Sequence, residues 1–157
     1  MPLGLQQTPD GYRIECSRSI DAPRDALWDL LTDTTRWSDW GPTIEAVDCR
    51  DRYIQRGTRG RVRVVDGIGG VWIPFRITSC ADYRWSWTVG PPSFGAFDLA
   101  PHVPATAHRI EGDQEKENGN ETDGCRAVLE IPPLAAGYAV VCERALVKLD
   151  RIAAREA

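Results

Sequence analysis

The sequence of 157 residues lacks a long hydrophobic segment. No window approaches the roughly 18 consecutive apolar residues of a membrane-spanning helix, and residues 1–12 lack the basic start and apolar run of a signal peptide. We therefore expect a cytoplasmic protein that does not insert into membranes.

Cysteine and histidine are scarce and scattered along the chain. The five cysteines include no Cys-x-x-Cys pair, and the two histidines, His102 and His108, have no cysteines or carboxylates at ligand spacing. This pattern argues against a disulfide framework and against a zinc site. A Gly-x-Ser-x-Gly motif is also missing, so a serine nucleophile has no support. We expect neither a metal nor another cofactor.

Lysine is rare as well, because 17 of the 19 basic residues are arginine. The net charge is −4, yet residues 111–124 hold six acids and one lysine, which leaves the rest of the chain at +1. This balance excludes a broadly basic nucleic-acid-binding protein. Six arginines crowd one predicted hairpin and are most simply a solvated outer face, with an anionic partner or headgroup as the alternative: Arg50, Arg52, Arg56, Arg59, Arg61 and Arg63.

Tryptophan, by contrast, is abundant. All six tryptophans lie in the first 87 residues. An indole ring covers a large area and carries one polar N–H group, so it suits a protein core and equally the wall of a pocket that binds an organic ligand.

The periodicity of the apolar residues predicts a single α+β domain over residues 1–157. A helix follows Pro23, a short helical turn carries Trp37 and Trp40, and a long amphipathic helix covers 134–155. Seven strands are predicted at residues 12–20, 44–52, 60–65, 71–80, 83–89, 103–111 and 125–131. The remaining segments are expected to be a flexible stretch at 1–11, an apolar loop at 90–101 and an acidic hairpin loop at 111–124.

Several segments in this order resemble the START-related superfamily, also called the SRPBCC or helix-grip group, and its polyketide cyclase/dehydrase-like members in particular. The matching segments are 19–23 (SIDAP), 27–33 (LWDLLTD), 36–42 (RWSDWGP), 57–60 (GTRG), 85–87 (WSW), 108–111 (HRIE) and the final helix. The resemblance spans residues 12–155. It implies a seven-stranded antiparallel sheet that grips the C-terminal helix, with two short helices after the first strand and a hydrophobic cavity between sheet and helix.

The side chains expected to line such a cavity are mostly aromatic. They are Trp28, Trp37, Trp40, Phe75, Trp85, Trp87, Phe94, Phe97, His108, Tyr138, Val141, Cys142 and Ala145. On the predicted strand, His108 shares a face with Thr106 and Ile110, so it is either a cavity-facing acid, base or hydrogen-bonding group, or a structural histidine. Cys142 is expected to be a packed, inert thiol.

Three functions agree with these observations. The first is binding or transport of a small hydrophobic or amphipathic molecule. The second is a cyclase or dehydratase in which His108 or Tyr138 moves a proton while the pocket positions a flexible substrate. The third is a non-enzymatic interaction module that acts through the arginine-rich hairpin. A monomer and a homodimer are both compatible with the sequence.

Overall fold

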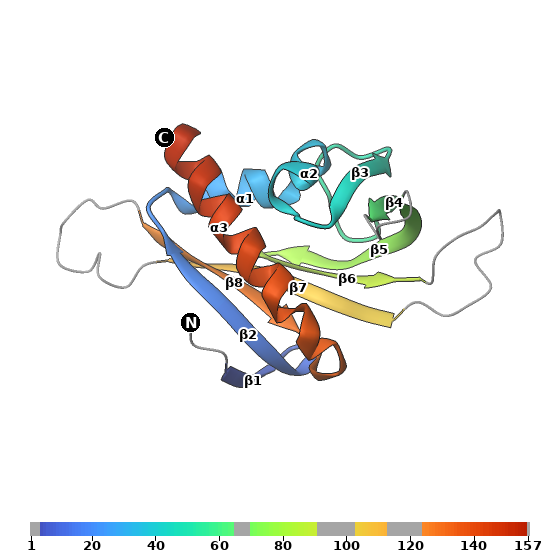
Figure 1. Ribbon diagram of the computed structural model, residues 1–157, viewed down its shortest axis with the longest axis horizontal. Helices are drawn as coiled ribbons and strands as arrows, with labels where there is room; N and C mark the ends of the chain where they lie inside the picture. Colours follow the sequence, from blue (N-terminus) through green and yellow to red (C-terminus); the bar gives the residue numbers. More distant parts are fainter. Residues whose placement is uncertain (1–3, 65–69, 91–102, 113–123, 157) are drawn as a thin grey trace.

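The computed structural model describes residues 4–64, 70–90, 103–112 and 124–156. Strands from this part of the chain form one sheet, and a long C-terminal helix lies across one face of it (Figure 1). In chain order the elements are β1 (Gly4–Thr8), β2 (Gly11–Ile20), α1 (Arg24–Thr32), η1 (Thr34–Arg36), α2 (Trp37–Trp40), β3 (Ile44–Cys49), β4 (Arg59–Val64), β5 (Val71–Ala81), β6 (Arg84–Val89), β7 (Val103–Gly112), β8 (Cys125–Ile131), η3 (Pro133–Tyr138) and α3 (Ala139–Glu156).

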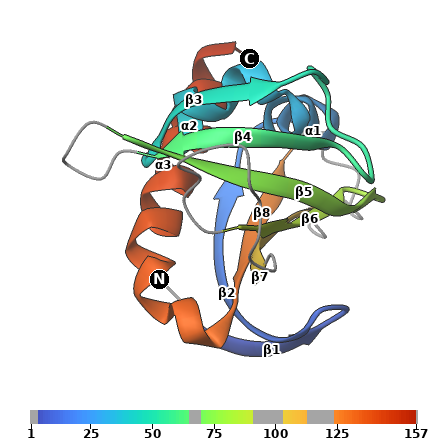
Figure 2. The same cartoon turned by 90° about the vertical axis from the view of Figure 1, so that its right-hand side faces the viewer.

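The strands follow the spatial order β1-β2-β8-β7-β6-β5-β4-β3, and every pairing is antiparallel. Figure 2 shows the sheet curving around α3, with β1 at one edge and β3 at the other. The predicted helix-grip fold is therefore confirmed, including the short helices that follow the first long strand.

The described sheet has eight strands rather than the expected seven, because β1 adds to the edge of β2. The expectation of a flexible segment at 1–11 is therefore wrong for Gly4–Thr8. This strand is mostly polar and exposed, so no alternation of apolar residues marks it in the sequence. A tight turn holds it against β2: Thr8 Oγ1 donates to the Gly11 carbonyl (2.8 Å), and Gly11 adopts a φ of +101° that favours glycine.

Alternation along the central strands directs one row of side chains toward α3. Trp85 on β6, His108 on β7 and Leu129 on β8 lie directly opposite one another, and all three are buried. The buried face of α3 adds Cys142, Ala145, Leu146 and Leu149. Burial of a leucine side chain stabilises the fold by about 1.5–3 kcal/mol, so this row and this helix face form the core that joins sheet to helix.

The C-terminal helix begins later than the periodicity predicts. Residues 133–138 form the 3₁₀ segment η3, and the α-helix runs from Ala139 to Glu156 instead of over 134–155. Pro132 and Pro133 supply no backbone N–H groups, and Ala135 has non-helical dihedral angles (φ −107°, ψ 28°). Tyr138 is the last residue of η3 and directly precedes the first residue of α3.

Hydrogen bonds fix the short helices against each other. The Asp33 carboxylate accepts a hydrogen bond from the backbone N–H two residues later (3.0 Å) and so caps the next helical turn. The indole N–H groups of Trp37 and Trp40 donate to the carbonyls of Leu31 (2.9 Å) and Leu30 (3.2 Å). Both tryptophans of α2 are therefore held by the last turns of α1.

Two features of the sequence prediction lie outside the described residues. They are the apolar loop, including Phe94 and Phe97, and the acidic loop over 113–123. Within the described ranges, none of the helices is both long enough and apolar enough to cross a bilayer.

Candidate functional site

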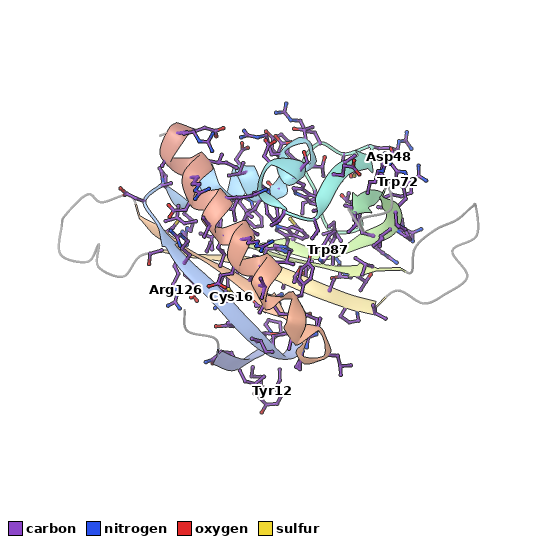
Figure 3. The ribbon with its side chains drawn as sticks, viewed as in Figure 1. Tyr12, Cys16, Asp48, Trp72, Trp87 and Arg126 are labelled. Carbon is purple, nitrogen blue, oxygen red and sulfur yellow. The ribbon has the colours of Figure 1, made fainter. Side chains whose placement is uncertain are left out.

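A stack of three rings lies on the α3 side of the sheet. Trp85 lies between Trp37 and His108, with ring centroids 5.2 Å and 3.8 Å apart and interplanar angles of 2° and 12°. Trp87 meets all three rings edge-on at 5.6, 5.5 and 6.2 Å, and it lies beside α3 in Figure 3. Aromatic pairs of this geometry contribute about 0.5–1.5 kcal/mol each beyond the burial of their area. The stack is therefore rigid.

A small inner cavity of about 30 Å³ remains between this stack, α2 and α3. A buried water needs only about 10–15 Å³ measured in this way, so the space holds one or two water-sized groups. The large internal cavity that the resemblance implied is, in the described part of the chain, mostly filled by the aromatic rings.

Two residues that line this cavity each carry a buried nitrogen with no hydrogen-bond partner among the described residues: Nε1 of Trp85 and Nδ1 of His108. The side chains of Trp85 and His108 are 1% and 4% exposed. The other three indole N–H groups of the site are satisfied, since Trp37 and Trp40 donate to backbone carbonyls and Trp87 donates to Thr106 Oγ1 (3.3 Å). A buried polar group without a partner costs about 1–3 kcal/mol, so these two atoms are exceptional in the site.

Burial lowers the pKa of His108 from its ordinary value of 6.5 to about 3, although the Trp85 backbone and the Glu130 carboxylate oppose this effect. The imidazole is therefore neutral at physiological pH. A neutral histidine with so low a pKa is a poor proton acceptor, but one of its nitrogens can donate and the other can accept a hydrogen bond.

The other titratable groups at the cavity are neutral too. Burial raises the pKa of the Cys142 thiol to about 12, which agrees with the inert thiol expected from the sequence. Burial also raises the pKa of Tyr138, and its hydroxyl shares a hydrogen bond with Thr43 Oγ1 (3.2 Å). The described titratable side chains that line the inner cavity are therefore uncharged at physiological pH.

An apolar groove of about 340 Å³ adjoins the inner cavity. Its walls come from β3 to β7 and from the segment before α3, with aliphatic side chains such as Ile44, Val62, Ile73 and Val89. The groove and the inner cavity share five lining residues: Thr43, Ile44, Trp87, Thr106 and Tyr138. The two spaces therefore meet at Trp87 and Tyr138.

The structure brings nine of the predicted residues together around the inner cavity. They are Trp37, Trp40, Trp85, Trp87, His108, Tyr138, Val141, Cys142 and Ala145. Phe75 lies beneath them, in contact with Trp37 (5.4 Å) and Trp87 (5.5 Å), and lines neither space. Trp28 packs against Tyr83 (5.8 Å) and lines neither the inner cavity nor the groove, so its place in a ligand-binding wall stays a prediction.

The sequence prediction missed further lining residues. Those of the inner cavity are Gly41, Pro42, Thr43, Ile44, Thr106 and Leu129. Thr106 had a usable signal, because it lies two residues from His108 on the same strand face. The groove had none, because its apolar residues are spread over five strands and the segment before α3, with no single motif that marks them.

The opposite face of the same strands holds a network of ion pairs. The Glu130 side chain is fully buried, and its carboxylate accepts hydrogen bonds from Arg84 Nη2 (2.9 Å) and Arg109 Nη1 (2.8 Å). Arg109 also forms an ion pair with Glu15 (2.8 Å). Burial acts to raise the pKa of Glu130, but hydrogen bonds and charge from Arg84 and Arg109 lower it overall. This confirms that Arg84 lies opposite the apolar face, as its position in the alternation indicates.

Comparisons with known proteins point to one family. The family model described as "Polyketide cyclase / dehydrase and lipid transport" matches residues 12–128. A search of curated proteins found no match.

Solved structures share the fold at low sequence identity. The Zhui aromatase/cyclase from Streptomyces sp. R1128 is 15% identical, with 91% of this chain and 93% of that chain covered and a TM-score of 0.65. Protein Ms6760 from Mycobacterium smegmatis is 16% identical, with 96% of each chain covered and a TM-score of 0.63. Ara h 8.0201 is 10% identical, with 90% of this chain and 96% of that chain covered and a TM-score of 0.61. At these identities the likeness concerns the fold alone.

Proposed function

Because this chain belongs to the polyketide cyclase/dehydrase and lipid transport family, we propose that it binds a small hydrophobic or amphipathic molecule between the sheet and α3. The observation that carries this proposal is the apolar groove of about 340 Å³ that opens onto the aromatic cavity. Ligand sites of proteins typically measure about 300–1,000 Å³ and have mostly apolar walls with a few polar groups. The groove meets both conditions.

The ionisation of the site favours binding over proton transfer. His108 is neutral because burial lowers its pKa to about 3, and burial raises the pKa of Tyr138 and Cys142. Groups that move protons efficiently have pKa values near the working pH. These side chains are better suited to hold a ligand by hydrogen bonds and contact.

A cyclase or dehydratase is the second candidate, supported by the family description. In such an enzyme the pocket would act mainly by positioning a flexible substrate, with His108 or Tyr138 as a hydrogen-bonding group. A His108→Ala variant that converts a candidate polyketide at the wild-type rate would remove the histidine from that mechanism.

Ligand binding is tested by filling the groove. Ala105 lines it on β7, so Ala105→Trp is expected to reduce uptake of the apolar dye Nile red by at least about tenfold, since a bulky ring would occupy the space of the ligand. Val140→Trp is the matched control, because Val140 is 58% exposed and lines neither the groove nor the inner cavity. Native mass spectrometry of the purified protein should also detect a bound organic molecule. Absence of both dye uptake and a bound molecule in the wild type would refute the proposal.

A further inference from the structure

The inner cavity offers hydrogen bonds but no charge. Its described lining contains no aspartate, glutamate, lysine or arginine, and the described walls of the groove contain none either. The two polar atoms without partners, Trp85 Nε1 and His108 Nδ1, belong to stacked rings whose centroids are 3.8 Å apart. The two neighbouring rings therefore supply two unpartnered nitrogens among apolar lining residues, and we call this pair of nitrogens the polar spot.

We propose that this spot recognises an uncharged hydroxyl group on the ligand, with the indole N–H of Trp85 and the imidazole Nδ1 of His108 as its hydrogen-bonding partners. The hydroxyl enters the inner cavity, and the apolar body of the ligand lies in the groove. This inference rests on the proposed function, because it names the class of molecule that the same site binds.

The size of the inner cavity selects a small group. Its volume of about 30 Å³ admits a hydroxyl oxygen but not a ring. The groove, which shares Trp87 and Tyr138 with the cavity, has room for a ring system behind that oxygen. A ligand with one hydroxyl at the end of an apolar body therefore matches the sizes of the two adjoining spaces.

The chemistry of the two nitrogens selects a hydroxyl among small polar groups. An indole N–H only donates, whereas a neutral imidazole nitrogen donates or accepts according to the tautomer. A hydroxyl both accepts and donates, so it satisfies Trp85 in every case and His108 in either tautomer. A carbonyl oxygen only accepts, so it satisfies His108 only when Nδ1 carries the proton.

A carboxylate is excluded by the absence of a counter-charge. Moving an ionised group into an apolar site without a cation is strongly unfavourable. Burial keeps His108 neutral, so the imidazole does not supply that cation. The acid analogue of a hydroxylated ligand should therefore bind worse than the unsubstituted hydrocarbon.

Three probes of one shape test this inference: 2-naphthol, naphthalene and 2-naphthoate, measured by equilibrium dialysis at pH 7. The wild-type protein is expected to bind 2-naphthol about tenfold or more tightly than naphthalene, because two hydrogen bonds to otherwise unpaired buried atoms are gained. It should bind 2-naphthoate more weakly than naphthalene.

Matched variants show which side chains cause the preference for 2-naphthol over naphthalene. Trp85→Phe keeps an aromatic ring in the stack but removes the unpartnered N–H, so it should lower the naphthol preference to about threefold or less. Trp87→Phe makes the same change at a ring whose N–H already has a partner in Thr106. It is expected to weaken both probes alike and to keep the preference. His108→Phe should lower the preference as Trp85→Phe does.

The outcomes separate this inference from the proposed function. Equal binding of naphthol and naphthalene by the wild type would overturn the inference and leave ligand binding intact, with trapped water as the partner of the two nitrogens. Tighter binding of naphthoate than of naphthol would overturn it as well. Failure of all three probes to bind, together with no uptake of Nile red, would count against the proposed function itself.

Discussion

The two faces of strands β6, β7 and β8 differ in whether their buried polar atoms have hydrogen-bond partners. On the outer face, the fully buried Glu130 carboxylate is paired with Arg84 and Arg109. On the inner face, one residue away along the strands, Trp85 and His108 keep unpartnered nitrogens among the described residues. Both faces are covered, so burial alone does not explain the difference.

The comparison distinguishes buried polar groups that are paired within the protein from buried polar groups that are not. Ion pairs on the outer face link side chains of β2, β6, β7 and β8. Unpaired nitrogens on the inner face lower the stability of the folded protein, because water satisfied these atoms in the unfolded chain. Under the proposed function, a ligand that pairs with these atoms would restore this stability.

The largest change in the free energy of unfolding is expected when the ion pairs of Glu130 on the outer face are removed. Glu130→Ala should lower the free energy of unfolding by about 3 kcal/mol or more, because Arg84 and Arg109 lose the carboxylate between them. Glu111→Ala is the matched control: it also removes a partner of Arg109, but Glu111 is 42% exposed, and we expect a loss of at most about 1 kcal/mol. Urea unfolding measures both. Equal losses would mean that the burial of Glu130 is unimportant.

The free energy of unfolding should fall in different pH ranges for His108 on the inner face and Glu130 on the outer face. The pKa of His108 in the folded protein, about 3, lies below its ordinary value of 6.5, so the unfolded chain gains a proton that the folded protein does not. Its contribution is therefore present above pH 6.5 and is lost as the pH falls toward 3. From pH 7 to 5 this loss is about 2 kcal/mol in the free energy of unfolding.

The contribution of Glu130 follows a lower window, since its pKa is lowered from 4.5 and its stabilisation is lost only as the pH falls below that value. His108→Gln should thus flatten the decline in stability between pH 7 and 5, whereas Trp85→Phe, which retains the imidazole, should preserve it. Denaturant unfolding at several pH values provides the measurement. An unchanged decline in His108→Gln would contradict the neutral, buried state of this histidine.

A smaller loss of stability is expected when the indole N–H of Trp87 on the inner face loses its acceptor. Thr106→Val removes the acceptor of the Trp87 indole N–H, and we expect a loss of about 1 kcal/mol in the free energy of unfolding. Thr106→Ser retains the hydroxyl and should cost less. Since Thr106→Val keeps the methyl group and loses only the hydroxyl, a Thr106→Val variant as stable as the wild type would show that the hydrogen bond to Trp87 contributes nothing.

The smallest effect is expected at the exposed hairpin. Arg61 and Asp48 form an ion pair at 2.7 Å, and their side chains are 49% and 62% exposed. Arg61→Ala should therefore change the free energy of unfolding by less than about 0.5 kcal/mol. Thermal unfolding of this variant checks the expectation.

A separate pull-down tests the arginine-rich hairpin as a partner site, with Arg61 and Arg63 both changed to glutamate. If a partner that binds the wild type reproducibly is lost from this variant, the result would support the interaction-module hypothesis.

Much of the fold could be predicted from the sequence because alternation and helical spacing are local signals. The strand with Trp85 and Trp87 and the strand with His108 both form where the pattern predicts them. β1 escaped prediction because a polar edge strand depends on its neighbour for hydrogen bonds rather than on burial. The late start of α3 followed from the dihedral angles near Pro133, which periodicity does not report.

The candidate site was predicted less completely. Spacing does not distinguish Trp28, which packs against Tyr83, from Trp37, which enters the ring stack. Both lie on short helices among apolar residues. The difference depends on strands that are about 50 residues away in the sequence, at Tyr83 and Trp85.

The sequence by itself determined the order of strands and helices, the face to which each strand residue points, and the aromatic character of the site. These follow from the chain's own periodicity and composition. Only the tertiary structure decided that the rings nearly fill the inner cavity, that an apolar groove adjoins it, and that Trp85 and His108 keep unpaired nitrogens. The physical reason is that free volume and hydrogen-bond satisfaction depend on groups brought together from distant strands, and no local pattern records which groups will meet.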